Sequence, residues 1–295
     1  MSIYSDQVRK EFGQADEKRD AGLTTPAEIR RFDNILYGTD ETWQKLDVYC
    51  PQKAVAEGKK LPVIVSVHGG GWVYGDKERY QYYCMDLARR GFTVVNFTYR
   101  LAPEFQFPAP FEDTNLVFAW VKEHGADYFM DTEHIFAVGD SAGANCLAVY
   151  AAICTNPVFA KHFTFQTPDI TLRAIALNNG IASMKCEEKP EDLTSRLMAD
   201  YMPGGGTKEE LWLISPVYHV TADFPPTYLM TAPDDFLKME APEFAKKLTE
   251  ENVPFVYRFY QDAEELLGHV FHLNLRSKMA TICNDEECRF FQSYL

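Results

Sequence analysis

A serine flanked by glycines stands in the stretch Gly139-Asp140-Ser141-Ala142-Gly143. The apolar residues 135–138 before it predict a buried strand, and residues 145–153, rich in Ala and Leu, predict a helix. A strand that turns into a helix this sharply strains its pivot residue, and the two glycines keep side chains out of the corner. The serine hydroxyl is then exposed above the positive end of the helix, which suits a nucleophile. The motif alone also occurs in turns without chemistry.

Three consecutive glycines follow a second predicted strand, residues 61–67, directly after His68. Backbone N–H groups in such a loop can approach a ligand closely. Acyl transfer needs donors of this kind where negative charge develops on the carbonyl oxygen, and losing one typically costs ~10²–10³ in rate. We therefore assign the N–H groups of Gly70, Gly71 and Ala142 to an oxyanion hole. A flexible loop is the alternative, whereas a phosphate-binding loop is disfavoured because no Gly-x-x-x-x-Gly-Lys-Ser/Thr pattern follows.

Two further motifs accompany the glycine loop and the serine corner: Tyr-Arg-Leu-Ala-Pro-Glu at 99–104 and Phe-Pro-Ala at 107–109. With these four elements the chain resembles the hormone-sensitive-lipase-like serine esterases of the α/β-hydrolase fold. The resemblance covers roughly residues 35–275. It implies an eight-stranded, mostly parallel sheet with helices on both faces and a helical cap.

The pattern of strands and helices along the chain independently favours a doubly wound α/β sheet. Strands that alternate with helices of ten or more residues imply parallel pairing. The first two strands are separated by a Gly-Thr-Asp turn and suggest an antiparallel hairpin at the sheet edge. The expected strands are 34–37, 45–49, 62–67, 93–98, 135–138, 174–178, 227–231 and 255–260, and the main helices are 80–90, 112–123, 142–154 and 240–251.

A nucleophilic serine needs a histidine base and an acid that orients it, and in α/β-hydrolases these follow in the order Ser, Asp/Glu, His. The family's acid-x-Leu pattern after the strand 227–231 matches Asp235-Phe236-Leu237 and favours Asp235. Asp234 is the alternative and otherwise a solvated loop carboxylate. The family's second acid is absent, since Met239 stands in its place.

The base is expected in the loop after the last strand. The family's His-x-Phe pattern matches His269 with Phe271, which leaves His272 as the alternative. His68 belongs to the glycine loop and is expected to be structural. Ala144 departs from the family, in which a second glycine often follows Ser-Ala-Gly, and its methyl group is expected to tighten the packing under the corner.

Two segments lie outside the predicted sheet. Residues 1–33 carry charges and periodic apolar positions, including Val8, Phe12, Ile29 and Phe32, and predict short helices. Residues 181–222 are too long for a simple crossover. By resemblance, both segments form a cap over the serine within a single domain of residues 1–295. Such a cap excludes water and shapes the acyl and alcohol pockets.

Composition defines the setting of this chemistry. The 295 residues are 46% hydrophobic, enough for one large core, and the formal charge of −14 argues against nucleic acid or acidic membranes as partners. The chain shows neither an apolar N-terminal run nor ~18 consecutive apolar residues, so we expect no signal, anchor or membrane helix. The seven scattered cysteines suggest reduced thiols in the cytoplasm rather than disulfides or a zinc site. The sequence is compatible with a homodimer but does not determine the oligomeric state.

These observations predict a carboxylesterase that acts on short-chain acyl esters by a two-step acyl-enzyme mechanism. Ser141 attacks, His269 transfers the proton, Asp235 orients the histidine, and no metal or cofactor takes part. An amidase, deacetylase or peptidase with the same triad is an alternative that the sequence hardly distinguishes. A non-catalytic receptor that binds a small molecule under the cap is a second alternative, disfavoured because the histidine is present. A structural or interaction protein would leave the whole constellation unexplained.

Overall fold

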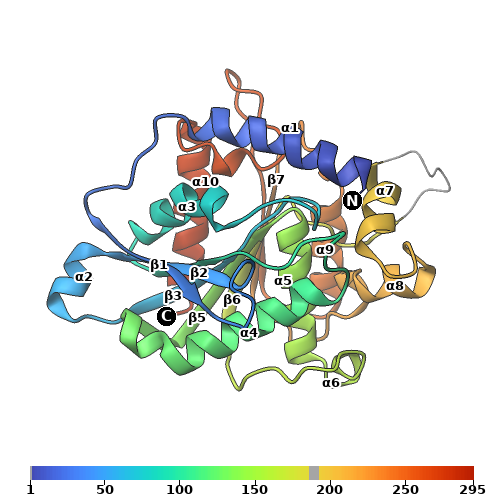
Figure 1. Ribbon diagram of the computed structural model, residues 1–295, viewed down its shortest axis with the longest axis horizontal. Helices are drawn as coiled ribbons and strands as arrows, with labels where there is room; N and C mark the ends of the chain where they lie inside the picture. Colours follow the sequence, from blue (N-terminus) through green and yellow to red (C-terminus); the bar gives the residue numbers. More distant parts are fainter. Residues whose placement is uncertain (1, 186–192) are drawn as a thin grey trace.

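The computed structural model describes residues 2–185 and 193–295. Eight strands form one sheet in the order β1-β2-β4-β3-β5-β6-β7-β8 (Figure 1). The pairs β1–β2 and β2–β4 are antiparallel and the others are parallel, which confirms the predicted mostly parallel sheet and its antiparallel edge hairpin. The strands are β1 (Ile29–Leu36), β2 (Lys45–Pro51), β3 (Leu61–Val67), β4 (Thr93–Phe97), β5 (Met130–Asp140), β6 (Leu172–Asn178), β7 (Thr227–Thr231) and β8 (Phe255–Phe259).

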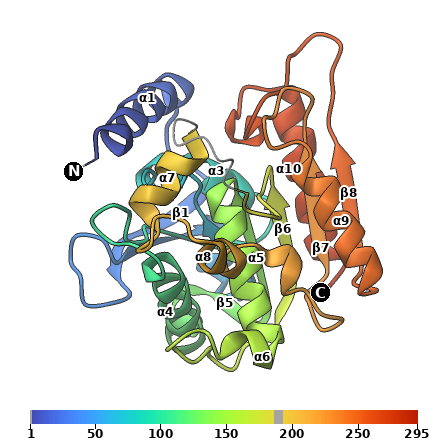
Figure 2. The same ribbon diagram turned by 90° about the vertical axis from the view of Figure 1, so that its right-hand side faces the viewer.

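Helices cover both faces of this sheet. Apolar side chains of α4, α5 and α9 pack in the core on one face, and those of α3 and α10 pack on the other. Figure 2 shows α5 and α9 in front of the strands in the turned view. The helices are α1 (Ile3–Asp20), α2 (Gln52–Glu57), α3 (Lys77–Ala88), α4 (Ala109–His124), α5 (Ala142–Thr155), α6 (Pro157–Ala160), α7 (Leu193–Tyr201), α8 (Lys208–Leu213), α9 (Glu240–Glu250) and α10 (Lys278–Gln292), with 3-10 turns at Gly125–Tyr128, Pro216–Tyr218 and Phe271–Leu273.

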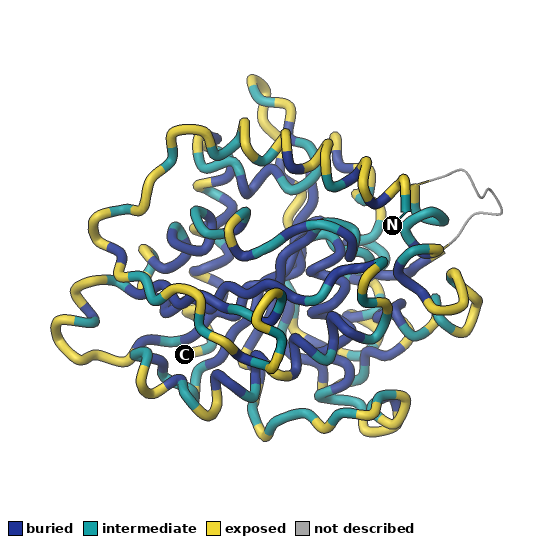
Figure 3. Tube along the Cα trace, viewed as in Figure 1, coloured by how far each residue is buried: buried dark blue, intermediate teal, exposed yellow. Residues whose placement is uncertain are grey.

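The central strands are apolar on both sides because both faces of the sheet are covered. On β3, Val63 and Val65 join the core beneath α4 and α5, whereas Ile64 between them joins the core beneath α3 and α10. Successive side chains of a strand point to opposite faces, so a continuous apolar run fills two cores. The buried residues therefore run through the middle of the molecule, with exposed residues around them (Figure 3).

The N-terminal segment differs from its prediction as short helices over residues 1–33. One helix, α1, spans Ile3–Asp20, and Ile29 and Phe32 lie on β1. β1 pairs with β2 in a register that shifts between Phe32 and Ile35, and Asn34 in between has φ of 60°. This irregularity hides the period of two from the sequence, which is why the apolar positions resembled a helix.

The helix predicted over residues 112–123 begins earlier in the structure, within a proline-containing segment. The helix α4 begins at Ala109, three residues earlier than expected, with Pro110 in its first turn. Proline is compatible with that position because the first N–H groups of a helix have no intrahelical acceptor. Only the part of the segment before Ala109 is a loop.

The helices α1 and α7, here called the cap helices, lie next to each other (Figures 1 and 2), and both line the cleft that contains Ser141. The guanidinium of Arg196 lies 4.0 Å from the ring centroid of Tyr4, and the hydroxyl of Ser5 donates to Asp200. The indole of Trp72 stacks on Tyr201 at 4.8 Å, which connects α7 to the loop after β3. Residues 186–192 of the predicted cap lie outside the described residues. In the described part of the chain, no helix combines the length and apolar character that crossing a membrane requires.

Candidate active site

Ser141 is the pivot between β5 and α5, and its backbone has the strained conformation that the sequence predicts, with φ of 51° and ψ of −121°. A methyl group at Gly139 would come within 2.6 Å of the carbonyl oxygen of Gly143, and one at Gly143 would come within 2.1 Å of that of Val67. Both positions therefore require glycine. The N–H of Ser141 donates to the carbonyl of Asn178 on β6 over 2.9 Å, which fixes the corner to the sheet.

His269 follows β8 in a long loop, and its imidazole meets the serine. Its Nε2 lies 3.0 Å from Oγ of Ser141, within hydrogen-bond distance. The other ring nitrogen, Nδ1, lies 2.7 Å from Oδ1 of Asp235. With the proton on Nδ1, the ring donates to the carboxylate and Nε2 is free to accept the serine proton. The three side chains thus form a continuous series of hydrogen bonds.

Asp235 lies just beyond the carboxyl end of β7, and its side chain is buried. The hydroxyl of Thr231 and the amide of Asn179 each donate to Oδ2 over 2.7 Å, and the N–H of Leu237 donates to Oδ1. Burial pushes the pKa of this carboxyl upward, but the hydrogen bonds from His269, Asn179 and Thr231 outweigh burial and hold the pKa below its ordinary value. Asp235 therefore stays ionised beside the imidazole.

The two alternative residues lie elsewhere. The side chain of Asp234 is exposed, and its backbone forms a bridge with Gly268. His272 is fully buried, its ring lies 5.2 Å from that of Tyr83 on α3, and burial lowers its pKa to about 3. His68 is buried as well and stacks on Tyr99 at 4.0 Å, as expected of a structural residue.

The glycine loop lies beside the serine. Gly70 has φ of 117° and Gly71 has φ of 61°, conformations that favour glycine. A methyl group at Gly70 would meet the carbonyl oxygen of Tyr74 at 2.1 Å. Within residues 2–185 and 193–295, the N–H groups of Gly70 and Gly71 donate to no group, and both glycines line the same cleft as Ser141 and Ala142. Their role as an oxyanion hole stays a prediction that this placement supports.

The cleft above Ser141 encloses about 250 Å³ and is mainly apolar. The cap helix α7 and the loop before it supply part of its apolar wall, namely Ile181, Met184, Leu193, Leu197 and Met198. The helix α1 contributes the polar side chains Asp16 and Arg19, which pair with each other over 2.8 Å. Asp16 also accepts from the hydroxyl of Tyr74. Arg19 also pairs with Asp20 over 2.7 Å, so carboxylates already occupy the guanidinium group of this wall.

Three residues of the cleft were not identified as functional from the sequence. The ring of Phe236 lies 4.3 Å from that of His269 and is 73% exposed. Asp140 and Tyr80 lie behind the serine and are joined by a hydrogen bond of 2.7 Å. Side chains alternate between the two faces of β5, and Phe136 and Val138 belong to the core beneath α3. Asp140 is the next residue in this series, so the sequence could have indicated a carboxylate that faces the same core.

No group of three or more potential metal ligands occurs among the residues that the structure describes. The six cysteines of that part of the chain, which include Cys283 and Cys288, are all free thiols. A methyl group at Gly180 would come within 2.8 Å of Cβ of Ala144. The extra methyl group thus fills the space between α5 and the end of β6.

Comparisons with known proteins agree with this architecture. The chain is 26% identical over 234 residues to the esterase LipQ of Mycobacterium tuberculosis, covering 75% of this chain and 55% of LipQ. It is 29% identical over 206 residues to the carboxylesterase NlhH of the same species, covering 65% of this chain and 62% of NlhH. The chain thus spans little more than half the length of the curated relatives it matches.

Among solved structures, an inhibited esterase B from Lactobacillus rhamnosis superimposes with a TM-score of 0.88, covering 99% of this chain and 97% of that one at 22% identity. This likeness shows the fold. A family model described as the alpha/beta hydrolase fold matches residues 64–273, which include the glycine loop, the serine corner and the loop of His269. The chain therefore belongs to the α/β-hydrolase fold family, in its hormone-sensitive-lipase-like group.

Proposed function

We propose that this protein is a serine carboxylesterase that hydrolyses short-chain esters through an acyl-enzyme. The observation that carries the proposal is the continuous hydrogen-bond series from Ser141 through His269 to Asp235, with distances of 3.0 and 2.7 Å. Nucleophile, base and orienting acid in this geometry are the requirement for acyl transfer. The curated relatives named esterase and carboxylesterase point to the same activity.

The reaction has two steps. Ser141 attacks the ester carbonyl carbon while Nε2 of His269 takes the hydroxyl proton, and the tetrahedral oxyanion accepts hydrogen bonds from the N–H groups of Gly70, Gly71 and Ala142. The imidazolium then protonates the leaving alcohol, and the acyl-serine remains. Water, deprotonated by the same imidazole, attacks this intermediate and releases the carboxylic acid. Asp235 stabilises the imidazolium in both steps.

Neutral esters with short acyl chains fit the cleft best. A volume of about 250 Å³ leaves little room for long chains. Arg19 pairs with both Asp16 and Asp20, so its charge is not available for an anionic substrate. The cap helices α1 and α7 cover the serine in this proposal and exclude water from the acyl-enzyme's surroundings.

Hydrolysis of p-nitrophenyl acetate and butyrate by the purified chain tests the proposal. We expect turnover by the natural sequence and a loss of at least ~10³-fold in Ser141→Ala, since the residual catalysis of triad variants is small. A variant with undiminished turnover would refute the assignment of Ser141. The matched amide p-nitroacetanilide separates an esterase from an amidase, and preferential cleavage of the amide would favour the amidase alternative.

The cysteines bear on where in the cell the activity takes place. Free thiols at the six described cysteines accord with the reducing cytoplasm, and we propose that location. Fractionation of the natural host tests it, and recovery from the medium or the membrane would contradict it. Light scattering of the purified chain decides between a monomer and a homodimer.

A further inference from the structure

A hydrogen-bonded bridge joins the glycine loop to the residue before the serine. The hydroxyl of Tyr80 accepts the N–H of Gly69 over 2.9 Å and donates its own proton to Oδ2 of Asp140 over 2.7 Å. Gly69 precedes Gly70 and Gly71 directly, and Asp140 precedes Ser141 directly. One hydroxyl group thus links the backbone that carries the oxyanion donors with the backbone that carries the nucleophile.

The bridge is buried and closely packed. Tyr80 is 5% exposed and Asp140 is 3% exposed. A methyl group at Gly69 would come within 2.7 Å of Oδ2 of Asp140, so the loop passes against the carboxylate itself. Contacts this tight transmit a displacement of either side to the other.

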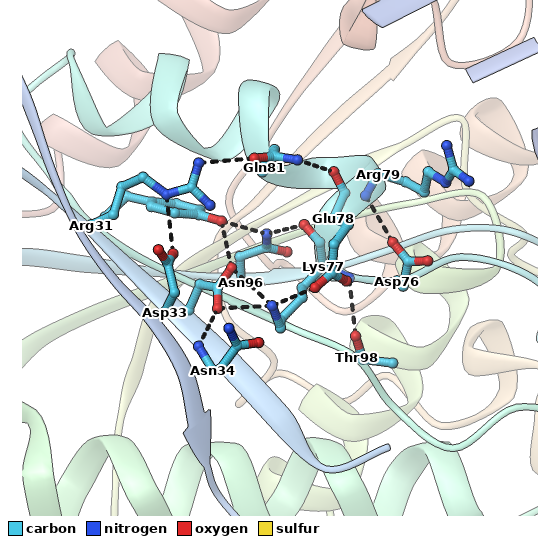
Figure 4. A network of polar contacts seen from close by, with 12 residues as sticks. Arg31, Asp33, Asn34, Asp76, Lys77, Glu78, Arg79, Gln81, Asn96 and Thr98 are labelled. Atoms are coloured by element: carbon cyan, nitrogen blue, oxygen red, sulfur yellow. Dashed lines mark hydrogen bonds and ion pairs between the residues drawn. The ribbon is translucent and has the colours of Figure 1, made fainter. Parts of the chain in front are cut away.

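Two rigid elements hold the ends of the bridge. Asp140 ends β5, where the alternation of the strand directs its side chain to the face covered by α3. Tyr80 lies in the first turn of α3, three residues after Lys77. The side chain of Asn96 on β4 donates to the carbonyl of Lys77 over 2.7 Å, which ties the start of this helix to the sheet (Figure 4).

Lys77 strengthens this attachment. Its ammonium group lies 3.0 Å from Oδ1 of Asp47 on β2, and both side chains are almost fully buried. Its N–H donates to the hydroxyl of Thr98, and Asp76 caps the helix by accepting from the N–H of Arg79 (Figure 4). Tyr80 is therefore presented from a helix that is fixed to the sheet by buried polar contacts.

Asp140 has little other structural use. In the described part of the chain, the hydroxyl of Tyr80 is the only group that donates to its carboxylate. Burial raises the pKa of Asp140 to about 6, against the opposing effect of the Tyr80 hydrogen bond. A buried carboxylate with a single donor is poorly compensated for its lost hydration, so fold stability alone does not account for it.

We propose that Tyr80 and Asp140 are positioning residues that set the distance between the oxyanion donors and Ser141. The inference rests on the proposed function. Asp140 polarises the Tyr80 hydroxyl, and that hydroxyl holds the Gly69 amide, so the following N–H groups of Gly70 and Gly71 point at the developing oxyanion. Such donors act only when they are already oriented before the reaction.

The test compares Tyr80→Phe with Tyr83→Phe. Tyr83 is a matched control because it is buried on the same helix and its hydroxyl meets Glu287 at 3.3 Å, away from the glycine loop. With p-nitrophenyl butyrate we expect Tyr80→Phe to lower kcat about tenfold, less than the ~10²–10³ of a lost donor, with KM changed less than about twofold. Tyr83→Phe should retain kcat. Equal kcat in the two variants would overturn the proposal.

Substitutions of Asp140 separate hydrogen bonding from general packing. Asp140→Asn keeps an oxygen that accepts from Tyr80 and should retain kcat within about threefold, whereas Asp140→Leu should resemble Tyr80→Phe. An Asn variant as impaired as the Leu variant would overturn the bridge as the cause.

A readout without catalysis keeps the two proposals apart. Hydrogen exchange of the Gly69 amide, whose N–H donates to Tyr80, should accelerate in Tyr80→Phe and stay unchanged in Tyr83→Phe. If no ester is hydrolysed by the natural chain, the proposed function fails while this measurement still tests the bridge. Unchanged exchange in Tyr80→Phe would contradict it.

Discussion

The side chain of Asn178 donates from Nδ2 to Oε2 of Glu287 over 2.7 Å, in the core directly behind the serine corner. The backbone carbonyl of Asn178 accepts the N–H of Ser141. Glu287 lies on α10 and is fully buried, with Tyr83 as a second donor at 3.3 Å. A helix near the C-terminus is thus connected to the nucleophile through one asparagine.

This pairing predicts a pH-dependent stability. Burial raises the pKa of Glu287 from 4.5 to about 7, despite the donors Asn178 and Tyr83. A raised folded pKa contributes stability that is full below the unfolded pKa and is lost as pH rises through the folded pKa. Between pH 4.5 and 7 the free energy of unfolding should fall by about 3 kcal/mol on account of this group. Glu287→Gln lacks the ionisable group, so its free energy of unfolding, measured by urea titration, should not show this fall with pH. An identical pH profile in the variant and the natural chain would contradict the prediction.

Thr231→Val tests the environment of Asp235, whose contribution to stability changes with pH in the opposite direction to that of Glu287. The variant removes one donor to Oδ2 without changing the side-chain shape. Since the folded pKa of Asp235 is depressed, its contribution is present above the unfolded pKa of about 3.9 and is lost as pH falls through the folded pKa. We expect a loss of roughly 1–3 kcal/mol at pH 7 and a smaller one near pH 3. Denaturant curves at the two pH values measure it, and an equal loss at both would show that the hydrogen bond does not depend on the charge.

Phe236→Ala should alter substrate preference without altering stability. The oxygen of a leaving alcohol must lie near Nε2 of His269, and the Phe236 ring lies 4.3 Å from that imidazole. Loss of an aromatic contact worth ~0.5–1.5 kcal/mol should raise KM several-fold for phenyl acetate. Ethyl acetate should be little affected.

The matched control for Phe236 is Met239→Ala, since that side chain is 70% exposed and does not line the cleft. The free energy of unfolding should change by less than about 0.5 kcal/mol in both variants. If Phe236→Ala and the natural chain have equal KM values for phenyl acetate, Phe236 does not contact the alcohol part of the ester.

Ser141→Gly should be more stable than Ser141→Ala. At φ of 51° a side chain is strained, whereas glycine adopts this conformation freely. We expect a difference of about 1 kcal/mol in the free energy of unfolding, measured by urea denaturation of the two inactive variants. A more stable alanine variant would show that the corner is not under strain.

The sheet and the three-residue site could be predicted because each rests on a local signal. Buried strands such as β7 are short apolar runs that end in turn residues, and β7 begins and ends where expected. The chain order and two short motifs sufficed to choose Asp235 and His269. In the structure His269 lies within hydrogen-bond distance of both Asp235 and Ser141.

What the sequence could not supply depends on contacts between distant segments. The strand β1 contains a register shift, so its apolar residues do not alternate regularly and their spacing resembles that of a helix. Tyr80 belongs to a helix whose tyrosines could all simply pack in the core. The role of its hydroxyl becomes visible only in the structure, where it hydrogen-bonds to Gly69 and Asp140. The exposure of Phe236 likewise follows from the path of a loop.

The parallel pairing of β6 between β5 and β7 determines how far Ser141 stands from Asp235, because both residues lie just past the ends of those strands. A slip of one residue would shift a strand by about 3.3 Å, more than any hydrogen bond tolerates. Catalytic alignment in this molecule is thus a property of its interior. Substitutions that loosen the middle strands should reduce turnover before they unfold the chain, even though they lie far from any bound ester.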